Sequence, residues 1–489
     1  MSSSIQIQKI WICPPLAFAR FGQSPDPMEN FHWASNDYSP RGTAETVIKP
    51  SLTFKIDAEG KIDHYLPAEI RFKDEHGHWR PVCPFFELHA RWSDSTEGPL
   101  TTEGPLTIDV LEQAGLQLSN ITWNVKAANH KAYHYTLSEG DKVKGEVTVT
   151  GDEHCAQTIA GTSLETGNHL VPNGKDIPLG QVQVIRPNPT WPEIRLRITP
   201  PKGLVYGPTN LEDRDLSALV PETQNRAAFL SKIHCILDPN AKWPLWKPID
   251  EDYRTNPGGL YAQEPDGKSL GFLDDSNDGL ITVTLTGSAV VGGTLTAYAR
   301  YTCCPQDFQP DRRPFVSIAD GLSNLVKREE VLNSEFIGGE NWPETEKDIA
   351  DLMQRVRETM EASNLDHQNL RSKLGNLAFS DTPDEPFEPM APRPGHPLPL
   401  TELGRMNHAR FLAYEVFKQR LAQRPELFIK WIRSPLAEPR EYDNKMPALM
   451  RGSDSAPMYI TQRQYYMMRE WLKIVKNSCE QNKESHEHE

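Results

Sequence analysis

The sequence predicts an α+β protein with a β-rich N-terminal unit over residues 1–325, built as an antiparallel sheet or sandwich. A mainly helical and irregular C-terminal part follows over residues 341–475. Short runs of β-branched and alternating apolar residues, bounded by Gly, Pro, Asn and Asp, fill the first part. Helical periodicity begins near residue 344, and seven prolines lie between residues 383 and 399. These observations separate the two parts of the chain.

Composition restricts the classes of function before any motif is considered. The 489 residues carry a net charge of −15, with 37% hydrophobic and 24% charged residues, as in globular proteins of two or three domains. Phosphate recognition needs clustered Lys and Arg, so this acidic balance argues against a nucleic-acid partner. No run of about 18 consecutive apolar residues is present, so we expect no membrane-spanning helix and no membrane partner.

The β-rich part is expected to contain antiparallel strands with one solvated face, because its runs alternate between apolar and polar residues. The first strand, near residue 10, should be central and should bury Ile10, Ile12, Leu16 and Phe18. Further strands are expected at residues 51–56, 68–72, 145–150, 180–185, 193–198, 280–285 and 294–301.

Two helices and a capped third are expected in the C-terminal part. Apolar residues recur at helical spacing over residues 344–374 and again over 401–424. Thr461 and Gln464 have the spacing of a capping box before a last helix. The proline-rich loop at 383–399 should be exposed and irregular, and the polar tail 476–489 should be disordered.

The seven cysteines show no CxxC spacing, which favours reduced thiols in a cytoplasmic protein. Cys303 and Cys304 are adjacent at the end of an apolar run. A redox-active pair would need an exposed thiolate of low pKa. Their place beside a strand favours buried structural thiols instead.

Phosphate-binding and metal-binding motifs are weak or missing. Neither GxGxxG nor GxxxxGK[ST] occurs. The pairs His76/His78 and His130/His134 lack the further ligands of a tetrahedral site, so we expect no metal. Asp274, Asp275 and Asp278 lie within six residues that end at Gly279. Such a loop can bind Ca²⁺, but a turn with Asx hydrogen bonds, closed by Gly279, explains the same residues and is favoured.

Four segments carry a family resemblance when they are taken together in order. They are residues 12–25 (ICPPLAFARFGQSP), 121–132 (ITWNVKAANHKA), 271–283 (GFLDDSNDGLITV), and 446–453 (MPALMRGS) with 461–465 (TQRQY) and Trp471. This combination resembles the cysteine tryptophylquinone amino-acid oxidases, the family of bacterial lysine 6-oxidase and glycine oxidase. The resemblance implies a β-rich N-terminal part, a long arm, and a small amine or amino acid as ligand.

The chain departs from that family where its quinone forms. In the active oxidases a Cys-bearing segment, a Gly-Gly-aromatic motif and the oxidised Trp follow the equivalent of Trp471. Here eighteen residues follow Trp471, without that motif or another Trp, and Cys479 has no partner there. Leu273 stands where the family turn often has Tyr. We therefore expect no cysteine tryptophylquinone and no other cofactor.

Three functions remain open at this point, and the third is a new enzyme. The first is a cofactor-less binding or scaffold protein, acting as a homo-oligomer or as the partner of a complete oxidase. The alternative is an amine or amino-acid oxidase that releases peroxide and ammonia. A new enzyme would draw on Asp274, Asp275, Asp278, Cys303 and Cys304.

Overall fold

The structure is a computed structural model. It describes residues 5–34, 48–94, 101–164, 169–209, 234–238, 273–307, 310–362, 412–436, 445–447, 450–451 and 456–487. The chain forms two compact units. Unit 1 comprises Met1–Phe31 and Pro50–Phe308, and unit 2 comprises His32–Lys49 and Gln309–Glu489. The boundary near residue 308 lies earlier than the 325 that the sequence predicts. The proline-rich span 383–399 lies outside the described residues.

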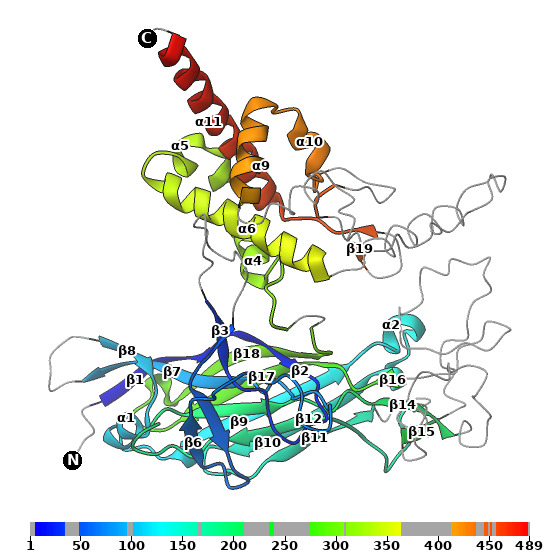
Figure 1. The fold of residues 1–489 in the computed structure, drawn as a ribbon. Helices are drawn as coiled ribbons and strands as arrows, with labels where there is room; N and C mark the ends of the chain where they lie inside the picture. The colour runs from blue at the N-terminus through cyan, green and yellow to red at the C-terminus, as the bar shows by residue number, and fades with distance from the viewer. Residues whose placement is uncertain are drawn as a thin grey trace. The chain divides into compact units, whose positions relative to one another are not determined.

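Unit 1 is built on one eleven-stranded sheet (Figure 1). In order of pairing, its strands are β1 (Ile5–Cys13), β7 (Phe85–Asp94), β13 (Arg195–Thr199), β12 (Ile177–Val184), β11 (Gln157–Ser163), β10 (Val143–Thr150), β9 (Ile121–Asn129), β17 (Asn277–Thr286), β18 (Thr294–Cys304) and β2 (Leu16–Arg20). Strand β8 (Thr101–Pro105) pairs with β7. Most of the expected strands are therefore present.

The sheet differs from the antiparallel sheet or sandwich that the sequence predicts. β2 runs parallel to β18, with Leu16 opposite Arg300, so the sheet is mixed. The amide of Ile7 in β1 donates to the carbonyl of Ala289, 2.8 Å away, beside the start of β18. The two ends of the strand order thus approach each other and nearly close the sheet. Pairing between strands about 280 residues apart leaves no local trace in the sequence, which explains the wrong prediction.

The first strand contributes to the core but is not central. β1 lies at one end of the strand order and buries Ile10 and Ile12, as expected. Leu16 and Phe18 in β2 are 40% and 36% exposed, so their predicted burial is wrong. They lie on the outer face of an end strand, where one side of each side chain meets water.

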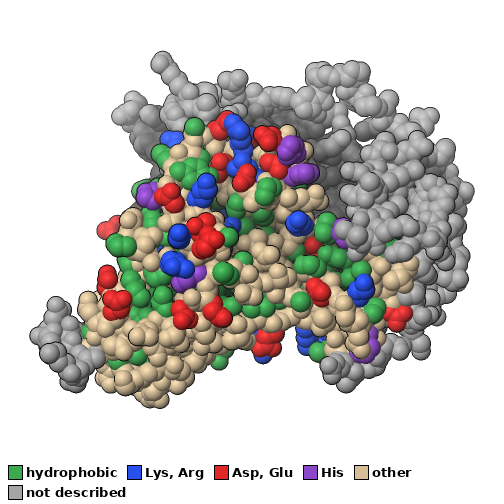
Figure 2. Space-filling model, turned by 90° about the horizontal axis from the view of Figure 1, so that it is seen from below, with side chains coloured by type: hydrophobic (Ala, Val, Ile, Leu, Met, Phe, Trp, Pro, Cys, Tyr) green, Lys and Arg blue, Asp and Glu red, His purple; other side chains and the backbone are tan. Residues whose placement is uncertain are grey.

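The core of unit 1 lies against the inner face of the sheet. Each large apolar side chain buried there contributes about 1.5–3 kcal/mol of transfer free energy. The largest fully buried members are Trp123, Tyr301, Phe86, Ile7, Leu88, Leu106, Leu111, Ile121, Ile159 and Leu170. On the face of unit 1 seen in Figure 2, acidic, basic and hydrophobic side chains are interspersed.

Smaller elements complete the described part of unit 1. They are β5 (Thr53–Ile56) with β6 (Ile62–Tyr65), β14 (Val205–Pro208) between β15 (Cys235–Leu237) and β16 (Leu273–Asp274), α1 (Ile108–Gln113), α2 (Tyr133–Thr136), and the pair β3 (Phe31–Trp33) and β4 (Ile48–Pro50), which spans the first unit boundary. Residues 68–72 form no strand, contrary to the prediction. The amide of Arg71 donates to the Glu29 carboxylate there, not to a neighbouring strand.

Unit 2 is helical. Among the described residues, its α-helices are α4 (Ile318–Val326), α5 (Ser334–Ile337), α6 (Trp342–Ala362), α9 (Leu412–Gln423), α10 (Leu427–Trp431) and α11 (Gln462–Glu487), with the short strands β19 (Met450–Arg451) and β20 (Ala456–Pro457). The predicted capping box is confirmed, since the Thr461 amide donates to Gln464 Oε1 at 2.8 Å and the Gln464 amide donates to Thr461 Oγ1 at 3.2 Å. Helix α11 continues to Glu487, so residues 476–487 are helical where disorder is expected.

The core of unit 2 gathers the apolar stripes that the sequence predicts. Phe417 of α9 stacks with Trp471 of α11 at 6.4 Å between ring centroids, and with Trp431 at 5.9 Å. Trp471 is fully buried, and its Nε1 donates to Glu346 of α6 at 2.9 Å. Ile349, Leu352, Val356 and Met468 lie in the same core. None of the helices in the described part of the chain is long and apolar enough to cross a membrane.

Candidate functional site

Strand register brings polar side chains from distant parts of the chain into two rows on the outer face of the unit 1 sheet. The alternation of β9, BiBiBeBiB from Ile121, places its even-numbered residues on this face. The first row contains Lys144, Ala128, Asp278 and Thr302. The second row contains Glu146, Lys126, Leu280 and Arg300.

These rows line a groove of about 1100 Å³. Ala128 has only a methyl group, and its neighbours in the row are Lys144 on one side and Asp278 on the other. The small Ala128 side chain therefore leaves a hollow between the larger, oppositely charged side chains of Lys144 and Asp278. His130, Lys131, His134 and Cys304 also line the groove.

The groove is more basic than the chain as a whole. Lys126, Lys131, Lys144 and Arg300 line it, against Glu146 and Asp278. Lys126 pairs with Glu146 at 3.5 Å, and Lys131 pairs with Asp274. Among the described residues, Lys144 and Arg300 form no ion pair. These two cations are consequently available to an anionic group in a chain whose net charge is −15.

Asp274 is a structural anchor behind the groove. Its carbonyl accepts from Asn129 Nδ2 at 2.8 Å, and its carboxylate accepts from Ser276 Oγ at 2.8 Å and from Lys131 Nζ. These contacts explain the acidic segment without an ion. The described residues contain no group of three or more His, Cys, Asp or Glu placed to hold a metal.

Gly279 does not close a turn, contrary to the prediction. It lies inside β17, opposite Tyr301 of β18. A Cβ at this position would lie 1.9 Å from Cε1 of the Tyr301 ring, so only glycine fits beneath that ring.

Asp275 is buried next to Asp274 and does not line the groove. Its Oδ2 accepts from the Leu204 amide at 2.9 Å, and its own amide donates to the Leu204 carbonyl. Its Oδ1 has no hydrogen-bond partner among the described residues. Burial, with a smaller contribution from the neighbouring Asp274 charge, raises the pKa of Asp275 to about 7. This carboxyl group therefore titrates near neutral pH.

The adjacent cysteines have different surroundings but the same protonation state. Cys303 points into the core, and burial raises its pKa well above the ordinary value. Cys304 Sγ accepts from Arg20 Nη1 at 2.9 Å. Burial still raises the Cys304 pKa, although Arg20 acts in the opposite direction. Protonated thiols are poor nucleophiles, which favours the structural role expected for the pair.

His130 is the neutral base of the groove. Burial lowers its pKa, and the nearby charges of Lys144 and Lys142 lower it further. Its Nε2 has no hydrogen-bond partner among the described residues. This nitrogen is buried, so it does not face the open groove.

Sequence reasoning located part of this site. Asp278 and Cys304 line the groove, whereas Asp274 and Asp275 lie behind it and the Cys303 side chain points into the core. The basic side chains Lys126, Lys144 and Arg300 were missed. The alternation of apolar and polar residues in β9, β10 and β18 indicates that these basic side chains face away from the core. Only the register between the strands shows that the three share one face.

Comparison with known proteins gives a distant structural relation and no match in sequence. No protein-family model and no curated protein matches the chain. Among solved structures, the L-Lys ε-oxidase from Marinomonas mediterranea is 14% identical with a TM-score of 0.43. Its Schiff base intermediate with L-Lys is 13% identical with a TM-score of 0.43. A third structure, the ε-lysine oxidase of the same organism, is 14% identical with a TM-score of 0.44. The matches cover 95% of this chain but only 60–61% of those chains.

Proposed function

We propose that the protein is a binding or scaffold protein whose unit 1 groove takes a small amino acid or amine, without quinone chemistry. The observation that carries the proposal is the row in which Ala128 separates Lys144 from Asp278. Neighbouring strands lie about 4.8 Å apart, so the outer two backbones of this row are roughly 10 Å apart. The Lys144 side chain is long enough to bridge much of that distance, whereas the Asp278 side chain is short.

A zwitterion matches this arrangement. Its carboxylate would accept from the Lys144 ammonium, and its own ammonium would donate to the Asp278 carboxylate. Asp278 already accepts from Thr302 Oγ1 at 2.7 Å, which fixes one carboxylate oxygen and leaves the other for a ligand. Arg300 lies in the same groove and supplies further donors.

The oxidase alternative needs a Trp ring joined to a Cys as electron sink. Trp123 is fully buried in the apolar core of unit 1, and Trp471 is held between Phe417 and Glu346 in unit 2. These settings support packing roles for both rings. A cytoplasmic location and a complete oxidase as partner remain part of this proposal.

The test is calorimetric titration with glycine, lysine, acetate and methylamine. Variants are Lys144→Ala and Asp278→Asn, with the exposed Lys55→Ala on β5 as the matched control. A hydrogen bond to a charged group contributes about 1.5–3 kcal/mol, so each groove variant should weaken amino-acid binding by about tenfold or more. Of the two groove variants, only Lys144→Ala should weaken acetate binding, and only Asp278→Asn should weaken methylamine binding.

Two results would refute the proposal. One is the absence of binding by the wild-type chain to every probe, and the other is equal weakening by Lys55→Ala. Amine-dependent peroxide release together with quinone staining of the denatured chain would establish the oxidase alternative instead.

A further inference from the structure

Three charged side chains of the unit 1 groove form no ion pair among the described residues. Lys144 and Arg300 are the cations, and Asp278 is the anion, whose carboxylate accepts one hydrogen bond from Thr302 Oγ1. The remaining lysine and glutamate side chains of the groove already form ion pairs. A ligand complementary to the three unpaired charges therefore carries two negative groups and one positive group.

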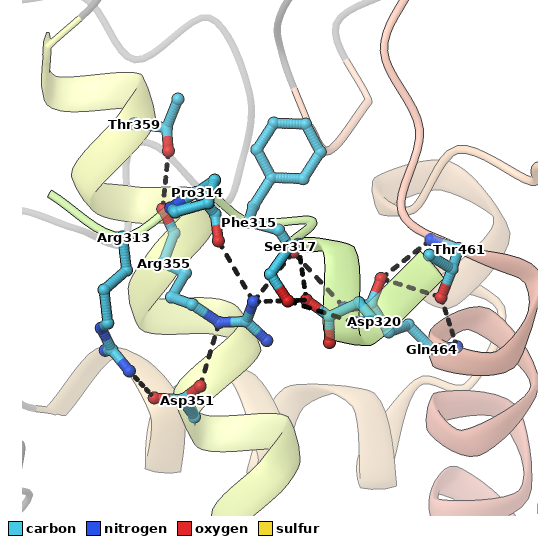
Figure 3. Close-up of polar contacts among 10 residues, drawn as sticks. All are labelled: Arg313, Pro314, Phe315, Ser317, Asp320, Asp351, Arg355, Thr359, Thr461 and Gln464. Atoms are coloured by element: carbon cyan, nitrogen blue, oxygen red, sulfur yellow. Dashed lines mark hydrogen bonds and ion pairs between the residues drawn. The ribbon is translucent and has the colours of Figure 1, made fainter. Parts of the chain in front are cut away.

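Arg355 in unit 2 shows how the carboxylates of the chain can satisfy a guanidinium. Its Nη1 donates to Asp320 at 2.8 Å, and its Nε pairs with Asp351 at 2.9 Å (Figure 3). Arg300 has no carboxylate in such a position among the described residues, and its side chain is exposed in the groove. Its planar fork of donors is therefore left for a carboxylate that comes from outside the chain.

Strand register places Arg300 beside Asp278. Strands β17 and β18 pair Asp278 with Thr302 and Leu280 with Arg300, so Arg300 is the diagonal neighbour of Asp278 on the outer face. Diagonal neighbours in an antiparallel pair lie about 7–8 Å apart. Leu280 is half-buried on the same face, next to Asp278 and directly opposite Arg300. The path from Asp278 to Arg300 thus has an apolar floor.

We propose that the groove selects an acidic amino acid, whose side-chain carboxylate binds Arg300. This inference rests on the proposed function, in which Lys144 binds the α-carboxylate and Asp278 binds the α-ammonium group. The side chain of the ligand starts at the carbon that carries the ammonium group, so it starts close to Asp278 and can extend over Leu280.

Glutamate has a suitable length for this path. Its three carbon–carbon bonds from the α-carbon to the side-chain carboxyl carbon, about 1.5 Å each, span roughly 4 Å. This is about half of the 7–8 Å between the diagonal neighbours, and the long Arg300 side chain covers the rest. The two methylene groups of the ligand would lie on Leu280.

The order of the charges disfavours other ligands. Lys144 on β10 and Arg300 on β18 are three strand spacings apart, roughly 14 Å, which is too far for one compact anion such as phosphate to bind both. Asp278 lies between them and repels an anion that has no ammonium group. A basic amino acid would place its second ammonium group beside Arg300, where like charges repel.

The test is calorimetric titration with L-glutamate, L-glutamine, L-lysine, glycine and glutarate. Glutamine replaces the second carboxylate by a neutral amide of the same size, and glutarate keeps both carboxylates without an ammonium group. Variants are Arg300→Gln, which removes the charge, and Arg300→Lys, which keeps it. The matched control is Arg186→Gln, because Arg186 is also an exposed arginine of unit 1 but does not line the groove.

The wild type should bind glutamate at least about tenfold more tightly than glutamine or glutarate, because each of these lacks one charge-assisted contact. It should bind lysine more weakly than glycine. Arg300→Gln should abolish the preference for glutamate over glutamine, Arg300→Lys should keep part of it, and Arg186→Gln should keep all of it.

Equal affinity of the wild type for glutamate and glutamine would overturn the inference, and this comparison needs no variant. An unchanged preference in Arg300→Gln would also overturn it. Glutarate binding as tight as glutamate binding would identify a dicarboxylate site instead.

Glycine separates this inference from the proposed function on which it rests. If Lys144→Ala and Asp278→Asn weaken glycine binding while the wild type does not prefer glutamate to glutamine, the proposed function stands and this inference alone is wrong. If the wild type binds neither glycine nor glutamate, both are wrong.

Discussion

Replacing Asp275 by Asn should remove a pH-dependent loss of stability from unit 1. Asp275 is 1% exposed, and its pKa of about 7 in the folded protein compares with 3.8 in an exposed carboxyl group. Between these two pH values the folded chain holds a proton that the unfolded chain has released. The stabilisation is therefore fully present below about pH 4 and is lost as pH rises through 7.

The size of the effect follows from that difference of about three pH units. Each unit corresponds to about 1.4 kcal/mol, so the free energy of unfolding should fall by up to about 4 kcal/mol between pH 4 and pH 7. Asn keeps an oxygen that can accept from the Leu204 amide but cannot ionise. The variant should therefore resemble the wild type at pH 4 and below, and its advantage in the free energy of unfolding should grow as the pH rises to about 7.

The measurement is urea unfolding at pH 4, 5, 6, 7 and 8. Unfolding is monitored by hydrogen exchange of peptides from β9 and β17, so that the measurement reports unit 1 alone. Asp63→Asn is the matched control, since the Asp63 side chain is 84% exposed. Equal stability of Asp275→Asn and wild type at pH 8, or lower stability of the variant at every pH, would refute this account of the buried carboxyl group.

Three further predictions concern packing, capping and thiol chemistry. Gly279→Ala should destabilise unit 1 by about 1–3 kcal/mol or more, because the added Cβ meets the Tyr301 ring. Gly104→Ala, with open space around it, should leave the stability of unit 1 unchanged. Equal denaturation midpoints of the two variants would contradict this prediction. Thr461→Ala should cost about 1 kcal/mol through loss of the α11 cap, measured as a lower melting temperature of unit 2, and an unchanged value would count against the cap. At pH 7, mass spectrometry after treatment with a disulfide reagent should show labelling of the exposed Cys13 and Cys155, and Cys303 should be labelled only after unfolding. Labelling of native Cys303 would show that its thiol is not held as described.

The parts of the fold that depend on neighbouring residues could be predicted from the sequence. The capping box of Thr461 and Gln464 lies within four consecutive residues, and the buried stripe of Ile349, Leu352 and Val356 follows from helical spacing. The helical tail beyond residue 475 was missed because it has no apolar stripe, although the preceding helix can continue through polar residues.

The groove depends on contacts that no local pattern records. Lys144 and Asp278 are 134 residues apart in the sequence and reach one row only because β9 pairs with both of their strands. A shift of one residue in either pairing would send one of these side chains to the core face. The acidic segment was noticed from composition, but burial separates its members, so that Asp278 lines the groove while Asp275 lies in the interior.

The path of the chain between the two units has a consequence for biosynthesis. Residues His32–Lys49 belong to unit 2, although the chain before and after them belongs to unit 1. During translation this early segment emerges long before Gln309–Glu489, the rest of its unit. The nascent chain can therefore fold unit 1 only with the insert His32–Lys49 still lacking the rest of its own unit. A gene cut after codon 308 would encode unit 1 together with His32–Lys49, which belongs to unit 2. A simple truncation at this boundary therefore gives neither unit in its natural form.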